Sequence, residues 1–141
     1  FNGIYNFEEQ YDGMDNFLDL VMKFLNIQTN QKIEEYFDLY QTRLLLALKL
    51  FEISSTRPFS RTGYSVVNMN IFETWMLILS QFDISIIEEN EKLFLEVYES
   101  ILKSNDFIDN ILYLRDQKDR IIWRLNFISS KIKEINLNLG E

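Results

Sequence analysis

The stretch from Asn68 to Phe82, NMNIFETWMLILSQF, constrains the fold more than any other part of the chain. Five apolar residues follow one another from Trp75 to Leu79, so a helix here is apolar on nearly every side. Such a helix has to be covered by neighbours on several faces. The stretch therefore predicts a buried central helix, capped by Asn70 with Glu73 three residues later, as in a capping box. Asn68 is the alternative cap, two residues earlier.

The other helices follow from apolar spacing and from the scarcity of residues that break helices. Four Gly and one Pro in 141 residues leave few tight turns and favour long helices with few connections. A chain of this length fits one domain and can bury a core without a disulfide or a metal. We therefore predict that residues 1–141 form an all-α, single-domain bundle of five to six helices around the central one. The other helices are expected over residues 14–26, 31–53 and 86–103, over a short segment 106–112, and after Asp116.

Apolar stripes and capping patterns predict how three of these helices begin and pack. The 31–53 helix, capped by Asn30, carries two apolar stripes and should be sandwiched between two neighbours. Ser85 and Glu88 match a capping box at the start of the 86–103 helix. The last helix repeats apolar residues at spacings of four and three, like a coiled-coil seam. Packing within the domain is the preferred interpretation, and packing on a second chain in a homo-oligomer stays open. The seam comprises Ile121, Leu125, Ile128, Ile132, Ile135 and Leu139.

Charge is distributed unevenly along the chain. The net charge of −8 disfavours a general nucleic-acid surface, because binding phosphates needs concentrated Lys and Arg. Residues 83–109 hold eight acids and two bases, whereas residues 113–133 hold six bases and two acids. We therefore expect the 86–103 helix and the last helix to lie antiparallel and to attract each other.

The chain contains neither Cys nor His. Their absence excludes disulfides, thiolate metal sites, most zinc and iron sites, and Ser-His-Asp or Cys-His catalysis. We predict no catalytic, cofactor-binding or metal-binding residue here, and no enzymatic activity of this segment. No apolar run approaches the roughly 18 residues of a membrane span. Without an initiator Met or a signal-peptide pattern, the chain is interpreted as a fragment from the middle or C-terminal part of a larger cytoplasmic protein.

Two arginines in the irregular stretch 54–67 are candidate anion contacts. Arg57 and Arg61 flank Pro58, Phe59 and Ser60. Two guanidinium groups at this spacing suit a clamp for phosphate or another anion, since each can donate two parallel hydrogen bonds. The preferred interpretation is that they hold the loop in place by binding helix carbonyls or nearby acids.

Three bases of the last helix are candidate nucleic-acid contacts. Arg120, Arg124 and Lys131 flank its seam, and Trp123 offers an aromatic surface nearby. A nucleic-acid-contacting module is therefore the alternative function, although salt bridges to the acidic 86–103 helix are the preferred interpretation. Glu73, at the head of an apolar helix, suits acid–base chemistry, but a capping role is preferred.

Three short segments together resemble a known family. Residues 68–73 read NMNIFE, and residues 105–107 read NDF, followed by the pattern I-x-x-R-L over 121–125. In this order they resemble the N-x-A-L-F-E helix and the closing D-x-F and V-x-x-R-I patterns of bacterial GmrSD-type proteins. These are ParB-like proteins of modification-dependent DNA restriction and phage defence. Asn70 stands where the family usually has Ala.

The resemblance implies the helical region of such a protein without its catalytic domain. In the family this region follows a ParB-like domain whose Asp-Gly-Gln-Gln-Arg motif is tied to nucleotide-dependent chemistry, and no such string occurs here. The implied function is a helical scaffold and interaction module that supports the ParB-like domain of the same parent protein. The parent would be a nucleotide-dependent nuclease, and DNA would be reached only through it. The structural motif residues implied are Asn68, Phe72, Glu73 and Phe107.

Overall fold

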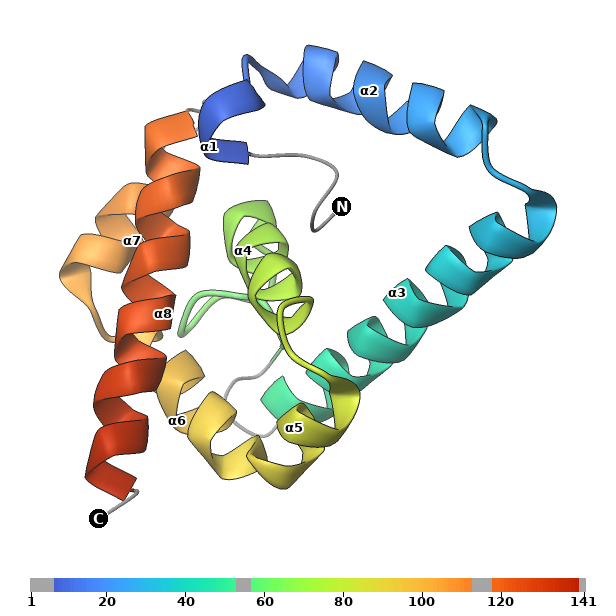
Figure 1. Ribbon diagram of the computed structural model, residues 1–141. Coiled ribbons are helices and arrows are strands. Elements are labelled where there is room, and N and C mark those ends of the chain that lie inside the picture. The colour runs from blue at the N-terminus through green and yellow to red at the C-terminus, as the bar shows by residue number, and fades with distance from the viewer. Residues whose placement is uncertain (1–6, 53–56, 113–117, 140–141) are drawn as a thin grey trace.

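A computed structural model of the chain describes residues 7–52, 57–112 and 118–139. Within these ranges the chain is helical, and its one β feature is an isolated bridge between Ser60 and Val67. The prediction of an all-α, single-domain bundle is confirmed (Figure 1). The helices are α1 (Phe7–Gln10), α2 (Met14–Asn26), α3 (Asn30–Phe51), α4 (Met69–Leu79), α5 (Ile84–Glu89), α6 (Glu91–Leu102), α7 (Asn105–Ile111) and α8 (Lys118–Leu139).

The central helix is α4. It packs against α3 and α8, and Figure 1 shows it in the middle of the molecule with these two helices on either side. Trp75, Ile78 and Leu79 are fully buried, as the apolar run from Trp75 to Leu79 predicts. Met76 is half-buried, however, and Leu77 is 38% exposed. The cover of the central helix is therefore incomplete on one face.

Polar side chains just before the helices set where α3 and α4 begin. Asn68 accepts hydrogen bonds from the backbone N–H groups of Asn70 (2.9 Å) and Ile71 (3.2 Å), so it caps α4. Thr29 caps α3 by accepting from the backbone N–H of Lys32 (3.2 Å). The alternative cap at Asn68 is thus correct, and the predicted caps at Asn70 and Asn30 are wrong. Each true cap has extended backbone angles, whereas Asn70 and Asn30 lie inside their helices.

The helix expected over residues 86–103 is divided into α5 and α6 at Asn90. The backbone of Asn90 leaves the helical region (φ −123°, ψ 30°), and its side-chain amide donates to the carbonyl of Ile86 (2.8 Å). Such local side-chain bonds compete with regular helix formation. Ser85 lies inside α5, which starts after Asp83, so the predicted capping box is wrong. The two helices still share one buried apolar face, which comprises Ile87, Phe94, Val97, Tyr98 and Ile101.

The seam of the last helix packs within the chain, as the preferred interpretation of its spacing predicts. Ile121 and Ile128 of α8 are buried, and Leu125, Ile132 and Ile135 are half-buried against the core. The helix lies along α6 and α4. Leu139 ends α8, and the description of side chains stops before it.

The loop before α4 is anchored by an aromatic side chain. Phe59 is 2% exposed and packs edge-on against Phe51 (5.8 Å between centroids) and Phe72 (5.2 Å). Its backbone N–H donates to the hydroxyl of Tyr98 (2.9 Å), and its carbonyl accepts from the N–H of Asn68 (2.9 Å). The backbone of Phe59 is left-handed (φ 61°), which is uncommon for a residue with a side chain. Burial of its ring and these two hydrogen bonds therefore hold the loop onto the core.

Replacing Phe59 with Ala should lower the free energy of unfolding by about 3–5 kcal/mol, the range for removing a buried aromatic ring. Ala does not relieve the left-handed backbone, so no gain offsets the lost packing. The matched control is Val66→Ala in the same loop, at an exposed side chain, which should change stability by less than about 0.5 kcal/mol. Urea denaturation followed by circular dichroism measures both. Equal effects of the two substitutions would contradict the anchoring role.

Candidate interaction surface

Arg124 is the most deeply buried charged residue among the described part of the chain, at 3% exposure. Its Nε donates to Oγ1 of Thr74 on α4 (2.8 Å), and Nη1 donates to Oδ1 of Asn110 on α7 (3.0 Å). Its Nη2 lies 4.0 Å from Oε2 of Glu73. A guanidinium group stays charged, and its burial is tolerated only where acceptors surround it. Arg124 therefore joins α4, α7 and α8 through one side chain.

The network continues along α4. The hydroxyl of Thr74 donates to the carbonyl of Asn70 (2.6 Å), and the amide of Asn70 donates to the carbonyl of Ile111 at the end of α7 (2.8 Å). Phe107, in the first half of α7, is fully buried and packs on Phe127 of α8 (5.9 Å between centroids). The segments 68–73 and 121–125, which are distant in the sequence, thus meet in space, and each also contacts the end of α7.

The position of Arg124 corrects two interpretations. Arg124 was expected on the exposed flank of the last helix, where it would reach nucleic acid or pair with the acidic helix. It is instead buried, and its carboxylate partner is Glu73 of α4. Glu73 in turn lies beyond the first turn of α4 and forms an ion pair, so the capping role preferred for it is wrong.

The other predicted contacts lie apart from this network. Arg57 is exposed, and Arg61 is half-buried with its guanidinium carbon 4.4 Å from the ring centre of Tyr64. Arg120 lines a polar hollow together with Asp106 and Asp109 of α7. Lys131 pairs with Glu134 on its own helix (3.4 Å). The predicted salt bridge to the acidic helix is therefore wrong for Lys131, as it is for Arg124. Nucleic-acid binding by these residues stays a prediction.

The first half of α3, residues 30–42, is here called the arm. Every residue of the arm is exposed, and Phe37 is 62% exposed. Burial on α3 begins only at Ala47, with Leu50 and Phe51. The prediction that this helix is sandwiched along its length is therefore wrong for the arm. Its exposed large apolar side chains are Ile33, Tyr36, Phe37, Leu39 and Tyr40.

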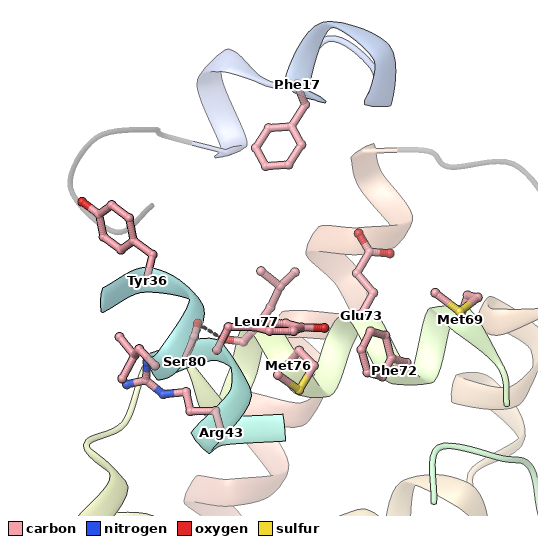
Figure 2. A pocket seen from close by; sticks show the side chains of 11 residues that line it. Phe17, Tyr36, Arg43, Met69, Phe72, Glu73, Met76, Leu77 and Ser80 are labelled. Carbon is pink, nitrogen blue, oxygen red and sulfur yellow. Dashed lines mark hydrogen bonds between the residues drawn. The ribbon is translucent and has the colours of Figure 1, made fainter. Parts of the chain in front are cut away.

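A cavity of about 560 Å³ lies between the arm, α2 and the open face of α4. Figure 2 shows Phe17 reaching in from α2, Tyr36 and Arg43 on the α3 side, and Met76 on α4. Most of the wall is apolar. Arg43 donates from Nη2 to the carbonyl of Phe82 (3.2 Å). The lining residues are Phe17, Tyr36, Leu39, Tyr40, Arg43, Met69, Phe72, Glu73, Met76, Leu77 and Ser80.

No pattern in the sequence indicates this cavity, although the stripes of the 31–53 helix and the run from Trp75 to Leu79 predict apolar faces on both helices. Periodic spacing marks a face that avoids water, but it does not tell whether another part of the chain covers it. The cavity is the space between α4 and the two elements opposite it, α2 and the arm, and Leu77 of α4 is exposed there.

No protein-family profile, curated protein or solved structure matches the chain. None of the helices in the described ranges is long and apolar enough to cross a membrane. The same ranges contain no group of three or more acidic side chains that could hold a metal ion.

Arg124→Met should destabilise the protein by about 1–3 kcal/mol, because the buried hydroxyl of Thr74 loses its donor. In a double-mutant cycle with Thr74→Val, the double mutant should lose less free energy of unfolding than the two single mutants lose together, by about 0.5–3 kcal/mol. Lys133→Met, at an exposed site on the same helix, is the control and should stay within about 0.5 kcal/mol of the parent chain. Strictly additive free energies of unfolding would show that the two side chains do not interact.

Proposed function

We propose that the chain is a helical scaffold and interaction module of a GmrSD-like DNA restriction or phage-defence protein. In this proposal the ParB-like domain of the same parent supplies the nucleotide-dependent chemistry in the cytoplasm, and the helical module supports that domain. The support for the scaffold role is the network around Arg124, which unites α4, α7 and α8. It connects the same segments, 68–73 and 121–125, on which the family resemblance depends.

The observation that carries the interaction role is the exposure of the arm. Thirteen consecutive residues, 30–42, are exposed, and five of them are large and apolar. Exposed apolar surface of this kind, flanked by charged residues, is typical of a protein–protein interaction site. Tyr and Phe are also enriched in interfaces, because they bury a large area at a low cost in conformational entropy.

The cavity beside the arm suits the same role. Its walls belong to α2, the arm and α4, so a partner that covers the arm would also close the cavity. Binding energy in interfaces concentrates where an apolar side chain of one partner fills a pocket of the other. The arm therefore offers exposed aromatic side chains next to a hollow for an anchoring side chain.

The family part of the proposal is tested by the reading frame that encodes the parent. A ParB-like domain with an Asp-Gly-Gln-Gln-Arg motif is expected upstream of Phe1. A complete parent gene without such a domain would overturn it.

The interaction role predicts that Phe37→Asp in the full-length parent abolishes phage protection while the module stays folded. Phe37 contributes an exposed ring, so its replacement should change the stability of the fold by less than about 0.5 kcal/mol. Plating efficiency of phage on bacteria expressing the parent measures protection, and the thermal midpoint of the purified chain measures folding. Val66→Asp, also highly exposed but in the loop before α4, is the matched control and should leave protection intact. Full protection by the Phe37 variant would argue against the arm as an interaction surface.

A further inference from the structure

The cavity between the arm, α2 and α4 has the size and composition of a small-molecule site. Its volume of about 560 Å³ lies within the roughly 300–1,000 Å³ of typical ligand pockets. Most of the side chains that line it are apolar, and they include the aromatic rings of Phe17, Tyr36, Tyr40 and Phe72. Rings from α2, α3 and α4 therefore surround a space that suits an apolar or aromatic molecule.

Arg43 gives this cavity a positive group that the described residues satisfy only in part. Its side chain is half-buried in the wall, and Nη2 donates to the carbonyl of Phe82 (3.2 Å). Its Nε is buried without a hydrogen-bond acceptor, and no carboxylate among the described residues forms an ion pair with Arg43. A guanidinium group stays charged and has several N–H donors, so one neutral carbonyl leaves most of them unused. An anionic group in the cavity would supply the missing counter-charge.

The one carboxylate in the lining lies away from Arg43. Arg43 reaches Phe82, beyond the C-terminal end of α4, whereas Glu73 belongs to the first half of this helix. Figure 2 shows the two side chains toward different ends of the cavity. The carboxylate of Glu73 also lies 4.0 Å from Nη2 of Arg124, which offsets its charge. An anion beside Arg43 therefore does not face an unpaired acid.

We propose that the cavity binds a small amphiphilic molecule with an apolar or aromatic body and one anionic group. The body packs among the aromatic rings of the wall, and the anionic oxygens accept hydrogen bonds from the guanidinium group of Arg43. The site does not depend on the proposed partner of the arm, because Phe37, the residue that tests that role, is not among the residues that line the cavity.

Two fluorescent dyes with the same aromatic rings test this site in the purified chain. Anilinonaphthalene sulfonate is anionic, and phenylnaphthylamine is its neutral counterpart without the sulfonate. The anionic dye should bind once per chain and about tenfold more tightly than the neutral dye, because charge-assisted hydrogen bonds are the stronger ones. Dye fluorescence, excited at a wavelength that tryptophan does not absorb, measures both affinities. Equal affinities, or no binding of either dye, would overturn the proposal.

Removing the charge of Arg43 tests its role. Arg43→Gln should weaken binding of the anionic dye about tenfold and leave that of the neutral dye within about twofold, so the preference between them disappears. Lys49→Gln, at an exposed position of the same helix, removes the same charge and should change neither affinity. The thermal midpoint of each variant measures its folding. A folded Arg43→Gln chain that still prefers the anionic dye would contradict the proposal.

A larger side chain in the wall tests the location of the site independently of charge. Leu39→Trp should weaken both dyes at least about tenfold, because the indole ring occupies space that the dyes need. Leu45→Trp is the control, since Leu45 is exposed on the same helix but does not line the cavity. Equal binding by these two variants would place the dyes outside the cavity and overturn the proposal. Phe37→Asp should bind both dyes as the parent chain does, which separates failure of this site from failure of the proposed function.

Discussion

The burial of the Arg124 guanidinium is the constraint on which the arrangement of the helices depends. A permanently charged group that leaves water needs acceptors at fixed positions, and it finds them on Thr74 and Asn110. This requirement sets the rotation of α4 and the placement of α7 against α8. Once Thr74 faces α8, its neighbour Trp75 is directed into the aromatic core on the side of α3 and α6. Apolar packing supplies most of the stability, and the polar network selects one arrangement.

The aromatic core explains why only half of α3 belongs to the folded domain. Phe51, at the end of this helix, stacks on Tyr98 of α6 (4.0 Å, 12° between planes) and lies 4.8 Å from Trp75 of α4. Phe59 closes the same cluster from the loop. These rings meet the last turn of α3, and a helix of this length spans about 33 Å. Its first half consequently extends past the core, where α2 and α4 only partly cover it.

Sequence periodicity predicted the parts of the fold in which a helix packs on its own chain. The buried face of α6, the seam of α8 and the burial of Trp75 all follow from apolar spacing. The same spacing in Ile33 and Phe37 predicted burial that the arm does not have, because periodicity identifies an apolar face without identifying what covers it. The sequence did contain a sign of the Arg124 network, namely Asn70 and Thr74 one turn apart on an otherwise apolar helix. Polar residues on a buried helix require partners, and a basic residue beside the seam of α8 was available.

Other features depended on tertiary contacts that no local pattern specifies. Phe59 lies among Ser, Thr and Arg in a segment without periodicity, and its anchoring role arises from rings contributed by α3 and α4. The division of the acidic helix at Asn90 likewise depends on a side-chain bond that competes with the backbone. Local sequence therefore specified the elements better than the loops and breaks between them.

The helix α4 connects the scaffold with the interaction surface. One of its sides carries Thr74, which Arg124 holds, and another carries Met76 and Leu77, which line the cavity. A partner that fills the cavity would bury those two side chains and so bind only the state in which α4 is folded in place. By mass action, such binding stabilises the whole module. Conversely, loss of the Arg124 network weakens binding, because it raises the population of molecules in which the binding surface is not formed. The stability of the scaffold and the affinity of the arm are therefore linked through α4, even though their side chains occupy different faces of it.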